Sequence, residues 1–494
     1  MTLCIFFFDV LTLFCIISCS KIGTNVKMDI SDTDNTVSYI NTKAAINYNV
    51  SIDAVSDYIS RNSSNKRSIN SIQPLIRNES IIGYIVNYDK GWEIYSADKR
   101  IRPILACSET GHFDVNAIPK TGISIWMNGI TEMTNEIRNG DSPSNINTAL
   151  WEDLPLNEFT QEVATTKVID SSAINNRNSE VYTWTKYVVT EQTEYQYHYL
   201  TYQPLIETEW AQGYPWNESI YINDTTRVAG CVAVALGQLL YYYHNKIGVP
   251  SGLYHTVTLS DWSFYNGTST EDPYYMTSLS RGDYTENSSR WNNMPIYAYQ
   301  PGKNSQYVSE LLLDIGNRVD MHYHCDTLGS SANIDNARNT LYSFNLYSVK
   351  SYGGPQNGGL NDIIAERPYY IQGNDITLHQ GHAWVIDGAT LSRYKTTTTY
   401  SWVLGYSPNS PNVGGIPATQ EEANAAAEAG GYDKPESGMI SVEVTYSPSM
   451  ADFHSNWGLN SNMNGYFANI GNYGSFSFSA NIMTLSNIVS NGTY

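Results

Sequence analysis

Apolar and polar positions alternate in the first third of the chain in a way that predicts a small α+β unit. Residues 82–97 alternate on both sides of Asp89-Lys90-Gly91, which is typical of a β-hairpin, and a short apolar stretch just after them predicts another strand. Apolar residues then recur at helical spacing over residues 123–137, and Gly140 ends that helix. We therefore expect a folded unit over residues 45–140.

The second half of the chain has the pattern of a larger domain. It is dense in aromatic residues from residue 203 onward, and residues 232–244 are apolar around most of the helical circumference, which predicts a buried helix. Residues 366–494 predict strands joined by polar turns. Between these strands, residues 409–438 are rich in Pro, Gly, Ala and Glu, and we expect them to form a long surface loop that acts as a flap over a substrate cleft.

A polar linker separates the two regions. Residues 169–180 consist mainly of Ser, Asn and charged residues, which predicts a compositional boundary near them. We expect five segments: an N-terminal signal at residues 1–19, a polar tether at 20–44, the α+β unit at 45–140, a linker at 141–202 and the large domain at 203–494.

Composition and charge narrow the class of protein. The chain has 494 residues, enough for two or three domains, and 41% of them are hydrophobic, enough for a sizeable core. Its 48 acidic and 28 basic residues give a formal net charge of −20, which repels phosphate backbones, so we expect no nucleic-acid partner. Only 15% of the residues are charged while Tyr alone occurs 39 times, a composition that suits a protein outside the cytosol.

The N-terminus predicts export. Residues 3–18 are almost wholly apolar, although Asp9 interrupts them, and the run is too short for a spanning helix, so it predicts the core of a signal peptide. Residues 16–19, Ile-Ile-Ser-Cys, resemble a lipobox, in which the Cys is diacylated and becomes the first residue of the mature chain. We expect a secreted, cell-surface or periplasmic protein, either anchored to an outer membrane through Cys19 or released by an ordinary secretory signal.

The cysteines do not predict a disulfide framework. Three of the six lie in the first 20 residues, which leaves Cys107, Cys231 and Cys325, an odd number with no CxxC pair and no metal-ligand spacing. An unpaired Cys in an exported protein is either buried or chemically active.

Cys231 and His382 have the local contexts of a nucleophile and its base. Cys231 directly precedes the buried helix, where unpaired N–H groups and the helix dipole favour a thiolate, and Gly230 lets the backbone turn sharply. His382 stands at the mouth of an expected strand over residues 381–388. His244 lies on the Cys231 helix, about 20 Å from the sulfur at ~1.5 Å per residue, and is excluded. A Cys on a helix that faces a His on a strand is typical of papain-like enzymes.

Three further residues fit the same site. Gln212 lies 19 residues before Cys231 (231 − 212), and its side-chain amide can pair with the Cys231 backbone N–H to hold an oxyanion. In Asn456-Trp457-Gly458, we expect the Asn amide to orient the imidazole of His382 and the indole to shield it. Taken singly, each residue also suits a structural position: a buried core Cys, a strand His, or an ordinary turn.

Taken together and in order, these motifs resemble the streptopain family of bacterial cysteine peptidases. The segments that resemble its peptidase domain are residues 212–217, 229–233 with 243–244, 291–295, 310–316 with 319–321, 381–388 and 456–458. Upstream, residues 92–100 and 104–111 resemble the family's inhibitory propeptide. Ordered motifs in the structural contexts that they need rarely coincide.

The resemblance implies a fold class and an activity. It implies an α+β protein in which a papain-like cysteine peptidase domain, with a helix-borne Cys facing an antiparallel sheet, follows a small α+β prodomain. Cys231 attacks the carbonyl of a protein or peptide substrate, Gln212 with the Cys231 N–H stabilises the oxyanion, and His382 protonates the leaving amine before water hydrolyses the thioester. This chemistry requires no metal and no organic cofactor.

The resemblance also implies a zymogen. The prodomain at residues 45–140 is expected to act as an intramolecular inhibitor, and a cut in the 141–202 linker is expected to release the enzyme. We expect the mature chain to begin between residues 177 and 203, with Arg177 and Lys186 as candidate cut sites.

Two departures from the family pattern concern the site. Leu459 stands where the family usually has a second Trp, which bears on the substrate subsites. The 74 residues from His382 to Asn456 (456 − 382) imply an inserted region beside the site.

Two other classes of protein share parts of the pattern: a papain-like amidase or transferase would have the same dyad, and a catalytically decayed surface adhesin would have lost the Cys or the His. The propeptide favours the peptidase, because indiscriminate proteolysis is what needs masking.

Overall fold

The computed structural model divides the chain into two units, Met1–Asn47 and Tyr48–Tyr494, and describes residues 47–490 with gaps. The predicted signal peptide and tether therefore lie outside the described residues, and so does the expected flap loop, because residues 1–46 and 409–439 are not described. The other segments outside the description are residues 63–66, 117–121, 141–144, 153–170, 174–179, 223–224, 248–263, 266–272, 275–288, 322, 324–331, 354–356, 376–379, 469–481 and 491–494.

The first folded region, which we call the prodomain, is the α+β unit that the sequence predicts. Its elements are α1 (Ile52–Asn62), β1 (Ile69–Arg77), β2 (Ser80–Tyr88), β3 (Trp92–Ser96), β4 (Ile104–Ser108), α2 (Ile123–Asn139) and α3 (Asn145–Glu152). The predicted hairpin is confirmed: β2 and β3 pair antiparallel, and Gly91 between them has a φ of +76°, a backbone conformation that favours glycine. Helix α2 is also confirmed, and Gly140 caps its end.

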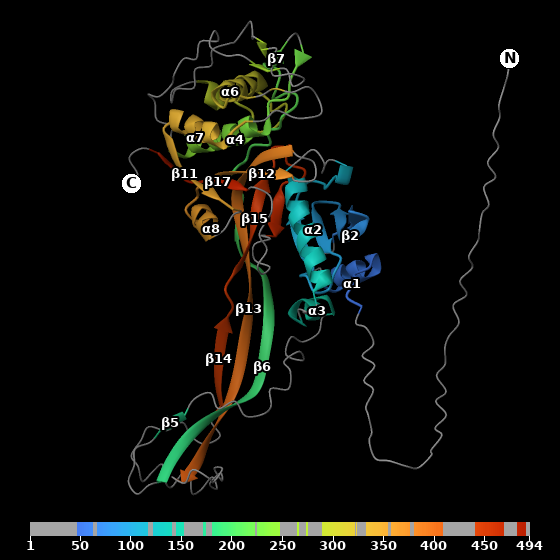
Figure 1. Ribbon diagram of the computed structural model, residues 1–494, viewed down its shortest axis with the longest axis vertical. Helices are drawn as coiled ribbons and strands as arrows, with labels where there is room; N and C mark the ends of the chain where they lie inside the picture. The colour runs from blue at the N-terminus through green and yellow to red at the C-terminus, as the bar shows by residue number, and fades with distance from the viewer. Residues whose placement is uncertain are drawn as a thin grey trace, which may run out of the picture. The chain divides into compact units, whose positions relative to one another are not determined.

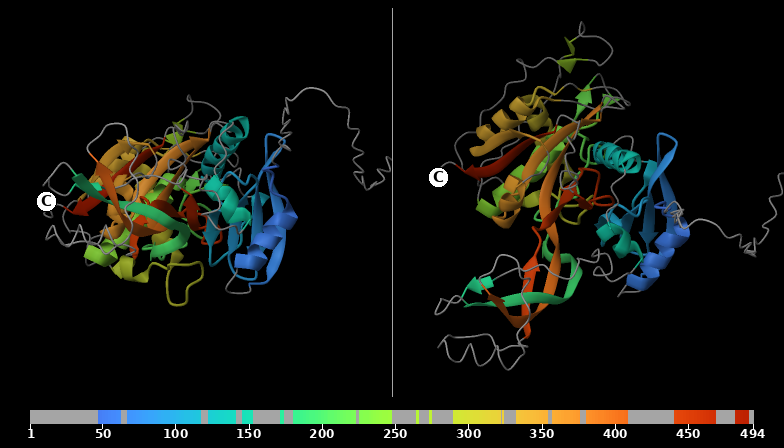
Figure 2. Two further views of the ribbon diagram at one scale, coloured as in Figure 1. Left: turned by 90° about the horizontal axis from the view of Figure 1, so that it is seen from below. Right: turned by 60° about the horizontal axis from the view of Figure 1, so that its bottom comes forward.

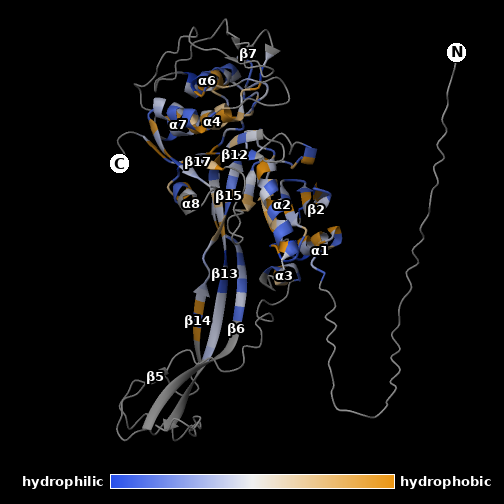
Figure 3. Cartoon of the chain, in the orientation of Figure 1, coloured by the Kyte–Doolittle hydropathy of each residue, from blue (hydrophilic) through white to orange (hydrophobic). Residues whose placement is uncertain are grey.

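The larger region, which we call the catalytic region, contains the predicted buried helix. Helix α4 (Cys231–Ile247) carries apolar residues along its length, as Figure 3 shows, and most of them are fully buried. It packs against the helix α6 (Ser305–Arg318) and against the strands β12 (Tyr369–Asp375) and β13 (Gln380–Pro408). The other helices described here are α5 (Ser289–Asn293), α7 (Ile334–Ser343) and α8 (Asn357–Ile364). Among the helices of the described residues, none is long and apolar enough to cross a membrane.

Strands of both regions form one sheet. Besides β12 and β13, the catalytic region adds to this sheet the strands β11 (Leu346–Tyr352), β14 (Ile440–Tyr446), β15 (Met450–Asn456), β16 (Gly465–Ala468) and β17 (Met483–Ser490). Two short hairpins are separate from the sheet, namely β7 (Tyr221–Ile222) with β8 (Thr225–Thr226) and β9 (Phe264–Tyr265) with β10 (Pro273–Tyr274). The order is β1-β2-β3-β4-β16-β15-β13-β12-β17-β11. The prodomain joins it through β4 and β16, where Cys107 lies opposite Tyr466 and Ala106 opposite Phe467.

Aromatic side chains from the two regions share one hydrophobic core. The ring of Phe467 lies 5.6 Å from Trp92 and 5.1 Å from Trp126, both in the prodomain, and 5.1 Å from Trp457 in the catalytic region. All four belong to the same buried cluster. Aromatic pairs in such edge-on arrangements add to the stability that their buried area provides. The prodomain is therefore docked on the catalytic region by core packing as well as by strand pairing.

Most of the predicted linker is not a loop in the described residues. Besides α3, it contains β6 (Glu180–Tyr202), which pairs with β13 from Glu180 opposite Pro408 to Tyr202 opposite Ala389, and the short β5 (Ser171–Ala173), which pairs with β6. The sequence-based expectation missed β6 because its residues are polar, yet Thr, Tyr and Val predominate in it and favour strands. The strand β14 pairs with β13 as well, and the three strands extend away from α4, α6 and α7 (Figure 1 and Figure 2).

The expected flap loop begins and ends on these long strands. Residues 409–439 connect β13 to β14, and the two strands pair with Ser401 opposite Ile440. Ser401 is 19 residues along β13 from His382 (401 − 382), which corresponds to roughly 60 Å in an extended strand. The ends of the loop are thus anchored far from the candidate base, and the flap role remains a prediction.

Candidate active site

Cys231 occupies the first position of α4, as the sequence predicts. Gly230 precedes it with a φ of +88°, and the Gly230 carbonyl accepts the first helical hydrogen bond, from Val234 N at 3.1 Å. This turn directs the thiol to the positive end of the helix dipole. The residue is almost fully buried, with 8% of its surface exposed, and has no disulfide partner.

His382 lies on β13, beside the nucleophile helix. It stands opposite Gly373 of β12, and the backbone N–H of the next residue, Ala383, lies near enough to the Cys231 thiol to lower its pKa in part against the effect of burial. The structure therefore brings the two predicted dyad residues to one place, although they are 151 positions apart (382 − 231).

A backbone carbonyl fixes the imidazole ring. The Nε2–H of His382 donates to the carbonyl oxygen of Trp457 at 3.0 Å, and because a carbonyl can only accept, the lone pair of the neutral ring is on Nδ1. Burial lowers the pKa of His382 to about 4, and the Trp457 carbonyl opposes this only in part. Burial also raises the pKa of the Cys231 thiol, against the N–H groups of Ala383, Val232 and Cys231 itself. At neutral pH both groups are therefore uncharged in this closed form.

Asn456 lies at the end of β15 with its amide held by groups other than the imidazole. Within the described residues, its Oδ1 accepts hydrogen bonds from Gln238 Nε2 at 3.3 Å and from the Gly458 N–H at 3.2 Å, and its Nδ2 donates to the Thr208 carbonyl at 3.2 Å. The ring contact that the sequence assigned to the Asn456 amide is made by the carbonyl of the next residue. Gln238, fully buried on α4, was missed by the sequence analysis because only the folded sheet brings it to Asn456.

The Trp457 indole is buried beside the Trp384 indole, and the shielding role expected for it remains a prediction. It is 1% exposed, and its ring lies 5.0 Å from that of Trp384, which in turn lies 6.3 Å from the His382 ring and nearly parallel to it.

The backbone of Gln212 is hydrogen-bonded to the chain just before Cys231. Its carbonyl accepts a hydrogen bond from the Ala229 N–H at 2.9 Å, and the residue before it, Ala211, forms a β-bridge with Leu459. The Gln212 segment thus connects the residues before Cys231 with the residues after Trp457. This position suits the predicted oxyanion role, which remains a prediction.

The prodomain reaches the candidate base directly. Gly122, at the N-terminal cap of α2, lies so close to His382 and Trp457 that a Cβ at this position would overlap His382 Cδ2 and come within 3.0 Å of the indole. Ile125, one turn into α2, faces Gly373, the strand partner of His382. The sequence pattern identifies α2 as a helix but carries no signal for this contact, because the contact depends on how the two regions dock.

The prodomain also holds the chain that follows Trp457. The indole N–H of Trp92 and the backbone N–H of His112 both donate to the Asn462 carbonyl, at 3.1 and 3.0 Å. Farther along, the indole N–H of Trp126 donates to the Ala468 carbonyl at 3.0 Å. Together with the β4–β16 pair, these bonds fix the segment whose first residue holds the imidazole.

A buried ion pair crosses the same interface. Arg102 of the prodomain lies 2.7 Å from Asp452 of β15, and both side chains are about 95% buried. His198 of β6 lies 3.5 Å from the other carboxylate oxygen. Burial raises the pKa of Asp452, but Arg102 and His198 together outweigh burial, and the pKa ends below its ordinary value. Breaking such a pair from one side leaves an uncompensated buried charge.

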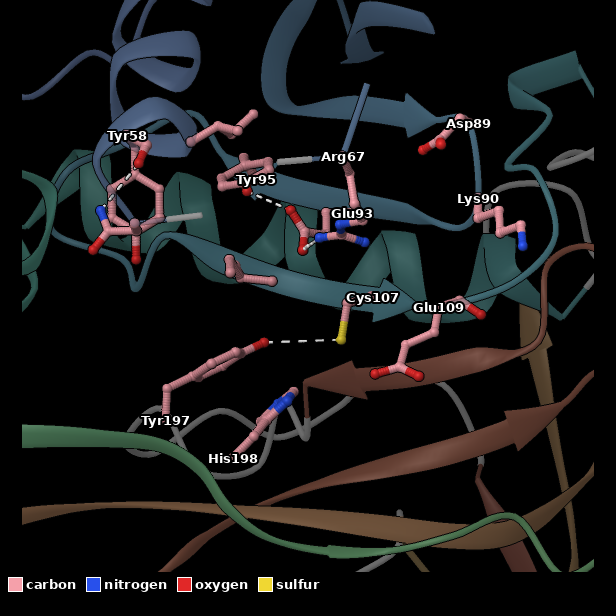
Figure 4. A pocket seen from close by; sticks show the side chains of 14 residues that line it. Tyr58, Arg67, Asp89, Lys90, Glu93, Tyr95, Cys107, Glu109, Tyr197 and His198 are labelled. Atoms are coloured by element: carbon pink, nitrogen blue, oxygen red, sulfur yellow. Dashed lines mark hydrogen bonds and ion pairs between the residues drawn. The ribbon is translucent and has the colours of Figure 1, made fainter. Parts of the chain in front are cut away.

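A cavity of about 660 Å³ lies between the prodomain and β6, away from the candidate dyad. Figure 4 shows Glu93 between Arg67 and Tyr95 on the prodomain side, and Tyr197 on the β6 side with its hydroxyl 3.8 Å from Cys107 Sγ. Burial raises the pKa of Cys107 to about 12, so this thiol is protonated at neutral pH.

Comparisons with known proteins match both regions of the chain. Residues 210–467 match the family model described as Peptidase C10 family, and residues 43–134 match the model described as Spi protease inhibitor. Streptopains from Streptococcus pyogenes serotype M28 (strain MGAS6180) and serotype M1 are each 26% identical, over 322 and 325 residues, or 62% of this chain and 68% of the relative.

Two solved structures from Prevotella intermedia are also similar. A prointerpain A fragment aligns with a TM-score of 0.46 and 18% identity, over 85% of this chain and 99% of that chain. Active wild-type interpain A, a cysteine protease, aligns with a TM-score of 0.34 and 20% identity, over 58% of this chain and 94% of that chain.

The fold and the site define a papain-like cysteine peptidase that still carries its inhibitory domain. Because the family match spans more than half of the chain, the chain belongs to the Peptidase C10 family. It is a cysteine endopeptidase preceded by a propeptide of the protease-inhibitor type. The resemblance, the fold class and the enzyme class expected from the sequence are thereby confirmed. The domain boundaries and the role of each site residue remain predictions.

Proposed function

We propose that Cys231 is the nucleophile and His382 the general base of this peptidase. The observation that carries the proposal is the position of the Cys231 thiol at the start of α4, near the backbone N–H of Ala383, the residue next to His382. His382 Nδ1 accepts the thiol proton, and the sulfur attacks the peptide carbonyl to give a tetrahedral oxyanion. The imidazolium then protonates the leaving amine, and water hydrolyses the thioester with His382 again as base.

The proposal assigns three supporting roles. Gln212 and the Cys231 N–H donate hydrogen bonds to the oxyanion. The Trp457 carbonyl keeps the imidazole proton on Nε2, and the Trp457 indole keeps water from one side of the site. Asn456 acts through the backbone: its amide is bonded to Gly458, Gln238 and Thr208, and these bonds position the turn that presents the Trp457 carbonyl.

In the full-length chain, the prodomain at about residues 45–140 keeps the site latent. Support comes from the contact of Gly122 with His382 and Trp457, and from the hydrogen bonds of Trp92 and Trp126 to the segment after Trp457. A buried site with a neutral thiol and a neutral imidazole lacks the charged pair that a thiol peptidase uses. Release of the prodomain exposes the dyad to water and to substrate and favours that pair.

Substitution of the dyad tests the proposal. Cys231→Ala and His382→Ala are each expected to abolish casein hydrolysis, because nucleophile and base act as one unit. Wild type should shorten itself under reducing conditions while Cys231→Ala stays full length. Cys107→Ser is the matched control and should retain activity, since that thiol lies in the cavity beside β6. A Cys231→Ala protein that still digests casein would falsify the assignment.

We further propose that the protein is exported and that Cys19 carries a lipid anchor. The apolar run at residues 3–18 and the lipobox-like residues 16–19 support this, and both lie outside the described residues. The test is detergent-phase partition of the protein from its native cell envelope, with Cys19→Ser as the comparison. An anchored protein enters the detergent phase only with Cys19 intact, whereas an ordinary secretory signal leaves both forms in the aqueous phase.

A further inference from the structure

We infer that strand β6 is a permanent strand of the catalytic region, so that the processed enzyme begins at or before Glu180. The inference rests on the proposed removal of the propeptide and specifies which part of the pro-region remains. Along the chain, β6 belongs to the segment between the prodomain and the peptidase motifs. In the folded protein, it is paired with β13, the strand that also carries His382.

The pairing with β13 holds β6 along most of its length, and its two gaps are short: residues 197–199 and Val189 have no opposite residue on β13, and the His198 N–H donates to the Ser392 hydroxyl at 3.0 Å. Its register with β13 runs from Glu180 to Tyr202, with two irregularities. One of the candidate cut sites, Lys186, lies inside this register opposite Trp402, and the other, Arg177, lies outside the described residues. Peptidases bind substrates as extended chains, so a cut inside a paired strand requires that the strand first detach.

Side chains reinforce the pairing along the described part of β6. Gln196 Oε1 accepts a hydrogen bond from Arg393 at 2.9 Å, and the rings of Tyr195 and Tyr394 lie 4.9 Å apart. Two pairs of threonine hydroxyls bond across the strands, namely Thr193 with Thr396 at 3.0 Å and Thr201 with Thr390 at 3.2 Å. These contacts are made within the catalytic region and do not depend on the prodomain.

The chain remains bonded beyond the end of β6. The Tyr202 carbonyl accepts a hydrogen bond from the Tyr466 hydroxyl at 3.3 Å. After two exposed residues, the Leu205 N–H donates to the backbone carbonyl of Asp387 at 2.9 Å, and the Ile206 N–H donates to its carboxylate at 3.1 Å. Asp387 is fully buried and also holds His454 at 2.6 Å, so the start of the peptidase motifs and the end of β6 are attached to the same strand.

The prodomain, by contrast, meets β6 loosely. The 660 Å³ cavity separates much of the two surfaces, and the 3.8 Å contact of Cys107 with Tyr197 is the hydrogen bond drawn between them in Figure 4. Among the described residues, the strand pairing of the prodomain with the catalytic sheet is limited to the short β4–β16 ladder. The structural division between the part that leaves and the part that stays therefore falls between α3, which ends at Glu152, and β6.

Loss of β6 would also expose a long edge of β13. From Ala389 to Pro408, β13 has β6 as its partner, whereas β14 covers its other edge only from Lys395 to Ser401. This part of β13 contains four consecutive Thr residues and few charges, a composition prone to pairing with other chains when its edge is open. Retention of β6 keeps that edge closed in the mature enzyme.

Two measurements test the inference. Wild-type protein is allowed to process under reducing conditions, and its N-terminus is determined by sequencing and intact mass. A product that begins at or before Glu180 supports the inference, and a dominant product that begins between residues 181 and 206 overturns it. Absence of any shortening counts against the proposed self-processing, and the second measurement then decides the inference alone.

The second measurement is hydrogen exchange on full-length Cys231→Ala protein, which cannot process itself. Amides of residues 192–202 in β6 should exchange at least about tenfold more slowly than those of the prodomain strand β1, and at rates close to those of β12. Exchange of β6 as fast as that of β1 would mean that β6 detaches with the pro-region, and would overturn the inference.

Discussion

The Nε2–H of His382 donates a hydrogen bond to the Trp457 carbonyl, so the geometry of the proposed base depends on the Trp457 backbone and on the groups that position it. The side-chain amide of Asn456, the residue before Trp457, helps to hold this backbone, because it is hydrogen-bonded to Gln238 and Thr208 in the interior. Gln238 also accepts a hydrogen bond from the Thr208 hydroxyl at 3.1 Å, so three side-chain and main-chain groups form one buried network.

Replacing Gln238 tests this network. Gln238→Leu keeps the volume but removes both hydrogen bonds, and leaving buried polar partners unpaired costs about 1–3 kcal/mol. We expect the free energy of unfolding in urea to fall by about that amount and kcat to fall roughly tenfold as the turn loosens, while Cys231 can still be titrated. The control is Gln192→Leu, an exposed position on β6, which should change neither. Unchanged kcat in Gln238→Leu would make the network purely structural.

The oxyanion assignment predicts a different signature. Gln212→Ala should lower kcat by about 10–10³-fold, as removal of a single oxyanion donor does, with normal thiol titration. The substitution leaves the backbone carbonyl of residue 212 in place, and this carbonyl accepts the hydrogen bond from the Ala229 N–H. We therefore expect the turn before Cys231 to keep its conformation. Steady-state kinetics on a peptide substrate separate the two effects, and an unchanged kcat would leave Gln212 with a packing role only.

The buried imidazole makes stability depend on pH. The pKa of His382 is about 4 in the folded chain against 6.5 for the ordinary group, so between these values the unfolded chain binds the extra proton. The free energy of unfolding is therefore at its full value above pH 6.5, and it falls by about 3 kcal/mol as the pH drops from 6.5 toward 4. Urea unfolding of Cys231→Ala protein at pH 7 and pH 4.5 should show the loss. Adding His382→Leu should reduce it, whereas adding His112→Gln, at an exposed position, should not.

Residue patterns predict correctly that Cys231 begins a buried helix and that His382 lies on a strand, because an apolar helix after a thiol and a strand that starts near a His are local features. The sequence does not predict which group binds the imidazole. The Asn456 side-chain amide and the Trp457 backbone carbonyl are both candidates, and only the folded backbone shows that the carbonyl is the partner. Gln238 and Gly122 were missed for the same reason: their contacts with Asn456 and His382, respectively, join residues more than 200 positions apart in the sequence.

At the scale of elements, α2 is the part of the prodomain that approaches the base. Its first residue, Ile123, follows Gly122, and Gly122 has a φ of −64°, which any residue adopts, so a substitution there acts by volume alone. Gly122→Ala should push α2 away from His382 and Trp457. We expect Cys231 in the full-length protein to be alkylated about tenfold or more faster at pH 7, as measured by peptide mass spectrometry at early times. Gly140→Ala, at the other end of the same helix, should leave the rate unchanged.

The long strands show where sequence patterns stop being informative. Residues 180–202 and 389–408 alternate little, and each pairs with the other along most of its length rather than with a neighbour close in the sequence. Their β character comes from Thr, Tyr and Val, and their pairing joins segments about 200 positions apart. The strands β2 and β3 were predicted because a two-sided pattern and a tight turn specify a hairpin locally.

At the scale of the whole described unit, the prodomain and the catalytic region share a sheet and a core, so latency has several independent supports. Release requires that the β4–β16 pairs open, that Phe467 leave Trp92 and Trp126, and that Arg102 leave Asp452. The aromatic contacts resist release at any pH and salt concentration, whereas the ion pair resists it because Asp452 is buried and charged.

Arg102 therefore offers a selective way to weaken latency. Arg102→Met keeps an apolar stem but removes the guanidinium, which leaves the Asp452 carboxylate buried without its charged partner at a cost of about 3–5 kcal/mol in the docked state. We expect the full-length protein to shorten itself after a lag at least about tenfold shorter than wild type, and its Cys231 to react faster with a thiol reagent at pH 7. The matched control is Arg100→Met, because Arg100 pairs with Asp98 inside the prodomain, and its loss should leave the lag within about twofold of wild type. Equal lags for the two variants would show that the Arg102–Asp452 pair contributes to folding of the prodomain rather than to its hold on the enzyme.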